Sequence, residues 1–147
     1  MSILYTFCPA TSEDAKFLYA LNRETMREHV VKTWGAWDEQ FQTEFFREHF
    51  DPADNQIIQV DQKPIGRLCV LREPARQLLS EMQISVAWQR KGLGSAIVCD
   101  LLAEARRHSV PLELQVLKVN VEAQKLYRRL GFSEIRETST HVLMRAE

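Results

Sequence analysis

A glycine-containing turn between a strand pattern and a helix pattern constrains this chain more than any other feature. The turn comprises Gln89-Arg90-Lys91-Gly92-Leu93-Gly94-Ser95. Residues 78–86 before it alternate in polarity, which is typical of a strand with one buried face. Residues 92–108 after it place apolar side chains at helical spacing and end in basic residues, which suit the C-terminal end of a helix dipole. The segment therefore predicts a strand, a tight turn and a long helix in direct succession.

The same turn has the composition of a phosphate-binding loop. Glycines at positions 92 and 94 let the backbone turn and approach a ligand closely. The first amides of the following helix have no partner within the helix and lie at the positive end of its dipole, so they attract anions. Arg90 and Lys91 add positive charge. Taken alone, the segment fits this interpretation and a simple strand-to-helix turn equally well.

Two nucleotide-binding loops share this physics, but the residues match neither of them. A P-loop requires Gly-Lys followed by Ser or Thr, and that tripeptide does not occur in the chain. The dinucleotide fingerprint requires a third glycine at the position of Ile97, and it belongs in an early strand-helix-strand unit. Both nucleotide-binding loops are therefore disfavoured.

The remaining periodicities predict an α/β (α+β) fold built around one mixed, mainly antiparallel sheet flanked by about four helices. The predicted strands cover residues 3–8, 56–60, 65–71, 78–86, 112–117, 132–136 and 140–144. The predicted helices cover residues 11–29, 38–51, 92–108 and 120–131, with a loop at residues 34–37.

Length, charge and cysteine content narrow the class of protein. The 147 residues predict a single domain, 1–147, that is large enough to bury a core. A net charge of -1 argues against binding to nucleic acid or to an anionic membrane. Residues 1–10 lack the pattern of a signal peptide, and no apolar stretch is long enough to span a membrane. Cys8, Cys69 and Cys99 lie in apolar stretches, which suggests buried free thiols and a cytoplasmic protein.

Two motifs together resemble those of the GNAT superfamily of N-acetyltransferases. The first is Val86-x-x-Gln89-Arg90-Lys91-Gly92-Leu93-Gly94, which is similar to the acyl-CoA-binding signature Gln/Arg-x-x-Gly-x-Gly/Ala. The second is the segment from Asn120 to Phe132, which carries Ala123, Leu126, Tyr127, Leu130 and Gly131. The motifs have the family's order and spacing. The resemblance covers roughly residues 56–145, whereas residues 1–55 match only in their strand-helix-helix layout.

The resemblance implies that the chain binds acetyl-CoA, or another acyl-CoA, as a co-substrate. Backbone amides in the glycine-containing turn would hold the pyrophosphate, and Asn120 would contact the cofactor or order the strands. The backbone near Ile84 and Val86 would pair with the pantetheine arm as though it were an added strand, so we expect the sheet to splay between residues 78–86 and 112–117. The implied cofactor-binding residues are Ile84, Val86, Gln89, Arg90, Lys91, Gly92, Leu93, Gly94, Ser95, Asn120 and Tyr127.

Tyr127 and Glu81 are the predicted catalytic residues. The resemblance places Tyr127 near the thioester sulfur, where its hydroxyl could hydrogen-bond the departing thiolate. Asn120, Ala123 and Tyr127 share a helix face, although Tyr127 could instead pack against neighbouring leucines. Glu81 lies on the strand that would border the acceptor, on the face opposite Met82, and could accept the amine proton. An exposed strand carboxylate without a catalytic role is the alternative for Glu81.

The acceptor is predicted to be a primary amine, and the candidate residues for contacting it are His29, Trp34, Trp37 and Gln83. The two tryptophans could form an aromatic wall for the acceptor, or they could seal the first two helices onto the sheet. Phe41 and Phe45 are expected to pack in the core. His29 and His49 lack metal-ligand spacing, so no metal site is predicted. His141 is expected at the surface.

The predicted function is transfer of an acetyl group from acetyl-CoA to a small-molecule or peptide amine, by direct attack in a ternary complex. No cysteine lies in a recognisable nucleophile motif, which argues against a covalent acyl-enzyme. The alternative from another class is a non-catalytic, acyl-CoA-binding regulatory module. The chain is expected to be a monomer, or a homodimer formed through its final strands.

Overall fold

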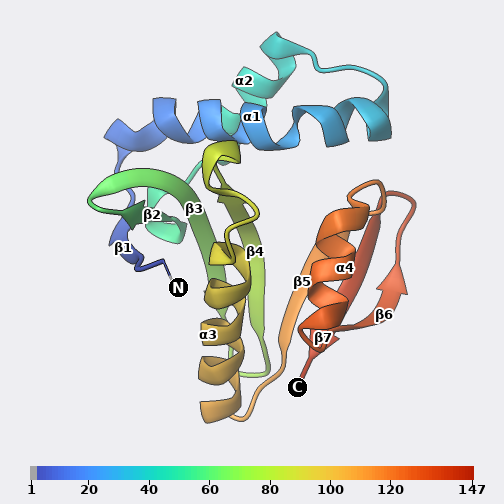
Figure 1. Ribbon diagram of the computed structural model, residues 1–147. Coiled ribbons are helices and arrows are strands. Elements are labelled where there is room, and N and C mark those ends of the chain that lie inside the picture. The colour runs from blue at the N-terminus through green and yellow to red at the C-terminus, as the bar shows by residue number, and fades with distance from the viewer. Residues whose placement is uncertain (1–2) are drawn as a thin grey trace.

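A mixed sheet of seven strands organises the computed structural model, which describes residues 3–147 (Figure 1). The strands are β1 (Thr6–Pro9), β2 (Gln56–Val60), β3 (Lys63–Arg72), β4 (Gln77–Ile84), β5 (Leu112–Leu117), β6 (Ser133–Glu137) and β7 (His141–Ala146). The α-helices are α1 (Ala15–Trp34), α2 (Glu39–His49), α3 (Leu93–Arg107) and α4 (Val121–Arg129). The chain also forms short 3-10 turns at η1 (Ser12–Asp14), η2 (Pro52–Asp54) and η3 (Val86–Trp88).

The predicted sheet type is confirmed by the strand order β1-β2-β3-β4-β5-β7-β6. Among the strand pairs of the described chain, β4–β5 is parallel and the others are antiparallel. The parallel pair follows from the connection, because α3 carries the chain from the end of β4 back to the start of β5. The fold is therefore the mixed α/β arrangement expected from the periodicities.

The predicted splay lies between β4 and β5. The two strands pair only where residues 77–79 meet residues 112–114. Beyond Leu79 they diverge, and Figure 1 shows them separating toward the end of the sheet that α1 crosses. The β4 edge from Ser80 to Ile84 therefore has no strand partner on its β5 side.

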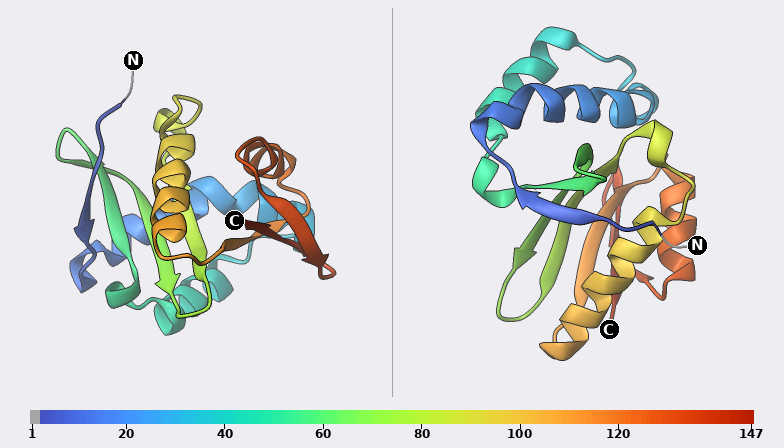
Figure 2. Two further views of the ribbon diagram at one scale, coloured as in Figure 1. Left: turned by 90° about the horizontal axis from the view of Figure 1, so that it is seen from below. Right: turned by 60° about the vertical axis from the view of Figure 1, so that its left-hand side comes forward.

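Alternating side chains give each face of the sheet its own helices. Ile58 packs in the cluster that contains Ile97 and Val98 of α3, whereas its neighbour Ile57 packs with Leu18 of α1. Successive strand residues point to opposite faces, so adjacent isoleucines serve different helix layers. Figure 2 shows α1 and α2 on one side of the sheet and α3 and α4 on the other.

An ion-pair cluster reinforces the paired end of the β4–β5 junction. Glu113 on β5 is buried, and its carboxylate accepts hydrogen bonds from Arg76 at 2.8 Å and from Arg145 on β7 at 3.0 Å. Burial raises the pKa of Glu113, but the two arginines outweigh it and leave that pKa below its ordinary value. The carboxylate thus connects the segment before β4 to β5 and β7.

Several element boundaries differ from the predictions, including the following three. β1 begins at Thr6, not Ile3. α1 continues to Trp34, five residues past the predicted end, because the chain offers no helix breaker before Gly35, which takes the left-handed conformation (φ 92°) at the C-cap. β4 ends at Ile84, two residues before the predicted end. Val86, which was predicted to lie in the strand, starts the 3-10 turn η3 instead.

Two expectations about individual side chains were wrong. Cys69 is buried, but Cys99 is exposed because it falls on the outward face of α3. Phe41 and Phe45 are 57% and 49% exposed rather than in the core, because α2 carries two aromatic rows and packs Phe46 and Phe50 inward instead. Among residues 3–147, no helix combines the length and the apolar character needed to cross a membrane.

Candidate active site

A cleft of about 680 Å³ lies where the sheet splays. Its walls come from α1, α2, β3, β4, β5, α4 and the start of β7. Because β4 and β5 diverge, the cleft reaches through the plane of the sheet. Side chains from the α1–α2 face and from the α3–α4 face therefore line the same space.

Glu81 and Tyr127 reach this cleft from opposite faces of the sheet. Glu81 points away from Met82 and Ile84, which pack against the core that includes α3. A register shift in β4, where Cys69 faces Glu81 but Val70 faces Leu79, leaves Ser80 as the extra residue of a bulge. Tyr127 comes from α4, is 9% exposed, and packs edge-on against Phe132.

The protein environment shifts both ionisable groups. Glu81 has solvent-accessible surface, yet the cleft walls replace much of the water around it, and this desolvation raises the pKa of its carboxyl while nearby Arg67 opposes the rise. Burial, followed by the charge of Glu81, raises the pKa of Tyr127 to about 12. Glu81 and Tyr127 therefore line the same cleft and are close enough for the charge of one to affect the pKa of the other.

The turn after β4 presents a row of free backbone amides. Gly92 is the N-cap of α3, takes a left-handed φ of 83°, and supplies no capping side chain. Arg90 also has a positive φ, 63°, which curls the loop. Within the described chain, the amides of residues 90–95 donate to no protein acceptor. The Lys91 ammonium lies 5.3 Å from the centroid of the Trp88 ring. This is the geometry of an anion-binding helix N-terminus.

Two contacts fix the start of this loop, whose residues 89–95 lie outside the lining of the cleft, as do Ile84 and Val86. The side chain of Gln89 donates to the Ile84 carbonyl at 2.8 Å. The Val86 amide donates to Glu24 of α1 at 3.0 Å. The side chain of Leu93 is buried in the core, so only its backbone faces the loop. Gln89 thus supports the loop through the strand, and Glu24 stabilises the 3-10 turn that replaces the predicted strand end at Val86.

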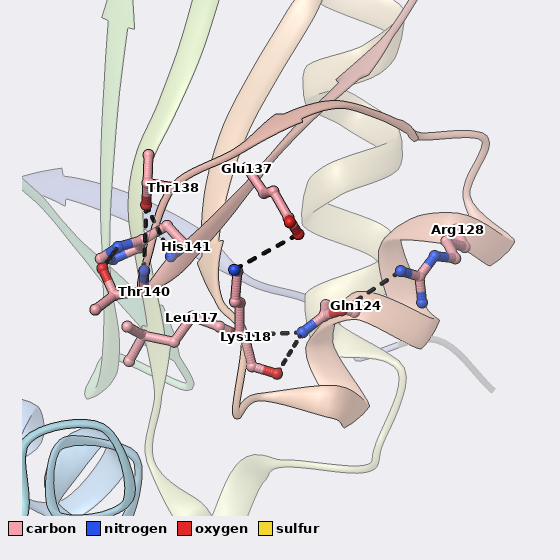
Figure 3. A network of polar contacts seen from close by, with 8 residues as sticks. All are labelled: Leu117, Lys118, Gln124, Arg128, Glu137, Thr138, Thr140 and His141. Carbon is pink, nitrogen blue, oxygen red and sulfur yellow. Dashed lines mark hydrogen bonds and ion pairs between the residues drawn. The ribbon is translucent and has the colours of Figure 1, made fainter.

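The β5–α4 turn positions the other wall. Asn120 is the N-cap of α4, where its side chain accepts from the Ala123 amide at 3.2 Å. Gln124 donates to the carbonyls of Leu117 and Lys118, as Figure 3 shows. Asn120, Ala123 and Tyr127 all line the cleft, so the helix face predicted from their spacing exists.

The residues predicted to contact the acceptor divide into two groups. Trp34, 59% exposed, and Gln83, 4% exposed, line the cleft. The structure does not bring His29 or Trp37 there: His29 lies outside the cleft lining, and the Trp37 indole donates to Glu39 at 2.7 Å. α1 is longer than predicted, and Gly35 turns the chain after Trp34, so the two tryptophans do not form one wall.

Arg67 and His141 are among the cleft-lining residues that the sequence analysis did not assign to the site, and His141 is half-buried where a surface position was expected. Arg67 on β3 faces the cleft through its register opposite Gln83. His141 starts β7, is half-buried, and hydrogen-bonds through Nδ1 to Thr140 Oγ1 at 2.7 Å (Figure 3). Arg67 interrupts the apolar run of β3, a signal that could have drawn attention to it. His141 carried no such signal, because its place depends on β7 pairing with β5.

No cluster of three or more histidine, cysteine or acidic side chains suited to a metal ion occurs among residues 3–147. The titratable groups in the cleft suit proton transfer, with a carboxylate on one wall and a tyrosine hydroxyl on the other.

Comparisons with known proteins agree with the fold. The family model described as the acetyltransferase (GNAT) family matches residues 17–132. No curated protein matches the sequence significantly. Among solved structures, the PaiA N-acetyltransferase of Thermoplasma acidophilum in complex with coenzyme A is similar, with a TM-score of 0.76 and 15% identity over 100% of this chain and 99% of that one.

Two further solved structures share the fold. The ribosomal-protein-S18-alanine N-acetyltransferase of Escherichia coli has a TM-score of 0.67 and 19% identity, over 97% of this chain and 93% of its own. Naa50 of Arabidopsis thaliana, in complex with the bisubstrate analogue CoA-Ac-MVNAL, has a TM-score of 0.65 and 13% identity, over 97% of this chain and 98% of its own.

Proposed function

This chain belongs to the acetyltransferase (GNAT) family, and from the geometry of its cleft we propose that it transfers an acetyl group from acetyl-CoA to a primary amine. The observation that carries the proposal is the meeting of Glu81 and Tyr127 in one cleft, on a sheet whose strand β4 leads from Glu81 to the loop before the uncapped N-terminus of α3. Transfer from acetyl-CoA to an amine uses a proton acceptor for the amine and a hydrogen-bond donor for the departing thiolate. It also uses an anion site for the phosphates of the co-substrate.

The residues present fit the co-substrate that the family implies. The free amides of residues 90–95, with Arg90 and Lys91, would hold its pyrophosphate. The unpaired edge of β4 up to Ile84 would accept its pantetheine arm as an additional strand. When bound, acetyl-CoA supplies the activated acetyl group. Val86 has a smaller part than the sequence predicts, because its amide already donates to Glu24.

Glu81 is the proposed general base. A protonated alkylamine has a pKa near 10.4, so freeing its lone pair at neutral pH costs about 4–5 kcal/mol, and a nearby carboxylate lowers the barrier by taking the proton. The raised pKa of Glu81 makes it a better proton acceptor than an ordinary carboxylate. Gln83, on the same strand face, is placed to orient the amine or a water between the amine and Glu81.

Tyr127 is proposed to hydrogen-bond the departing thiolate. With the pKa of Tyr127 near 12 and that of a thiol near 8.5, full proton transfer to the thiolate would be uphill by about 5 kcal/mol. A hydrogen bond from the hydroxyl avoids that cost and still stabilises the charge that develops on sulfur. The raised pKa therefore favours a hydrogen-bonding role over a complete acid role.

A thiol-release assay with acetyl-CoA and a broad amine panel tests the proposal. The panel includes peptides with free N-termini, because two structural neighbours are named for protein or peptide acceptors. We expect amine-dependent release of free thiol, with the acetylated amine identified by mass spectrometry. Calorimetric binding of CoA without turnover of any amine would instead support the regulatory module. Release of thiol without an acetylated amine would contradict amine transfer.

A further inference from the structure

One side chain in the cleft has a charge that the proposed reaction does not use. Arg67 lies on β3 directly opposite Gln83 and diagonally from Glu81. Diagonal neighbours across an antiparallel pair have their backbones about 7–8 Å apart, a separation that a long side chain such as arginine can span. Its charge also acts on Glu81, whose pKa it lowers.

A hydrogen bond to a buried asparagine restrains the orientation of Arg67. Its Nε donates to Asn55 Oδ1 at 3.1 Å. Asn55 is only 5% exposed, and its own Nδ2 donates to the carbonyl of Asp51 at 2.9 Å, which determines which amide atom faces the arginine. An arginine restrained through Nε directs its two terminal nitrogens forward as a fork.

The terminal nitrogens of Arg67 have no carboxylate partner within 4 Å in the described part of the chain. Asp51 and Asp54 also line the cleft, but Asp51 Oδ1 caps its own turn by accepting from the Ala53 amide, and Asp54 forms no ion pair with Arg67. Glu81 is the remaining acid nearby. A half-buried guanidinium fork without a bidentate partner is well suited to bind one from a ligand.

The residue opposite Arg67 requires a donor. Gln83 is 4% exposed, its Nε2 donates to Asn22 of α1 at 2.8 Å, and its Oε1 has no partner within residues 3–147. A buried amide oxygen without a donor is unfavourable by about 1–3 kcal/mol. A small rotation of this side chain toward the cleft that it lines would let an ammonium or amine N–H from the acceptor supply that donor, next to the carboxylate that takes its proton.

We propose that the acceptor carries a carboxylate a few bonds from its amine, and that Arg67 pairs with this carboxylate while Glu81 and Gln83 receive the amine. This proposal rests on the proposed acetyl transfer. The negative carboxylate of the acceptor would pair with the positive Arg67 on β3, and its amine would lie beside the negative Glu81 on β4. The lining of the same cleft also includes the apolar side chains of Met26, Val30, Phe45, Phe46 and Phe50, which suits an apolar side chain on the acceptor. An apolar amino acid, or a peptide with an acidic N-terminal residue, has this chemistry.

Matched acceptors test the proposal, measured as kcat/KM at a pH where the rate no longer changes. L-phenylalanine is compared with phenylalaninamide and with phenethylamine, both of which lack the carboxylate. The amide has a less basic amine and phenethylamine a more basic one, so a preference over both cannot come from amine basicity. A peptide beginning with Asp is compared with the same peptide beginning with Asn. We expect the carboxylate-bearing member of at least one comparison to react roughly 10- to 100-fold better.

The variant Arg67→Gln should lose much more activity on the carboxylate-bearing acceptors than on the carboxylate-free amines, and its remaining turnover of the latter shows that it folds. Arg67→Lys keeps the charge without the fork and should retain part of the preference. Arg72→Gln is the matched control, because Arg72 lies on the same strand but pairs with Glu104 outside the cleft. It should leave the preference unchanged.

The source of the carboxylate follows from which comparison shows the preference. A preference confined to the peptides assigns the carboxylate to a side chain, and one confined to L-phenylalanine assigns it to a free amino acid. Equal or better turnover of the carboxylate-free amines by the wild type would overturn this proposal and leave acetyl transfer intact, as would an equal loss on all amines in Arg67→Gln. No turnover of any amine would overturn both proposals.

Discussion

The two ends of the β4–β5 junction differ in pairing and in chemistry. At one end, residues 77–79 pair with residues 112–114, and buried Glu113 is neutralised by Arg76 and Arg145. At the other end the strands separate, and the side chains beside the gap include Glu81, Gln83 and Tyr127, which keep unmet charge or hydrogen-bonding capacity. The paired end neutralises its buried charge internally and leaves only the Gln77 side-chain oxygen without a partner among the described residues 77–79 and 112–114, whereas the splayed end exposes a carboxylate and a tyrosine hydroxyl to the cleft.

This difference shows how one sheet can serve stability and function. Polar groups without partners are unfavourable in a folded protein, and they persist where a stable neighbouring region holds them in place. The parallel pairing and the ion-pair cluster hold the start of β4 and β5, so the strands can diverge beyond Leu79 and admit a ligand strand. Mutations at the splayed end should therefore alter turnover, and mutations at the paired end should alter stability.

The largest effect is expected from Glu81→Gln at the splayed end. Removal of the proposed base should lower kcat/KM by roughly 10²- to 10³-fold. The wild-type rate should rise with pH through the raised pKa of Glu81, because only the deprotonated carboxylate can accept a proton. The variant should lack this rise in a thiol-release assay from about pH 5 to about pH 9. Glu134→Gln, on the edge strand β6, is the control, and an unchanged pH profile in Glu81→Gln would exclude the base assignment.

Tyr127→Phe, on the opposite wall of the splay, should have the next largest effect. Loss of the hydrogen bond to the thiolate should reduce kcat by roughly 10- to 100-fold. The Kd for CoA should change by no more than about twofold, because the ring still packs against Phe132. Steady-state kinetics and calorimetry measure the two quantities separately. An unchanged kcat would show that Tyr127 has only a packing role.

Glu113→Gln, at the paired end, should lower stability with little change in kcat. The change leaves Arg76 and Arg145 without their carboxylate; both are substantially exposed, so the free energy of unfolding should fall by about 1–2 kcal/mol. The midpoint of thermal unfolding should fall by about 3–6 °C. Because the pKa of Glu113 is lowered by folding, its contribution is present above the ordinary carboxyl pKa and is lost as pH falls through the lowered value. The wild type and the variant should therefore converge in acid; a large loss of kcat at constant stability would contradict the division between the two ends.

The smallest effect concerns the pH dependence of Arg67→Gln with a carboxylate-free amine. Arg67 lowers the pKa of Glu81, so its removal should raise that pKa and move the rising limb of the rate profile to higher pH. We expect a shift of less than about one pH unit, because solvent in the cleft screens the pair. Arg72→Gln should leave the limb in place. A shift to lower pH would contradict the arrangement of charges in the cleft.

The sequence by itself determined the local structure of the proposed donor half of the site. The strand-turn-helix succession around residues 89–95 depends on glycine conformations and helix-end amides, which act over a few neighbouring residues. The strand at residues 112–117 was predicted with its observed bounds, and Asn120 caps α4 as its position before a helix suggested. These features are local, so periodicity and motif spacing were sufficient to predict them.

Tertiary structure alone decided the acceptor half. Glu81 and Tyr127 lie 46 positions apart in the chain and on different sheet faces, and they share a cleft only because β4 and β5 diverge beyond Leu79. Arg67 and His141 enter the cleft through cross-strand register, and Trp37 is kept out of it by the turn at Gly35. Register and helix placement arise from packing over the whole core, and no short stretch of sequence contains that information.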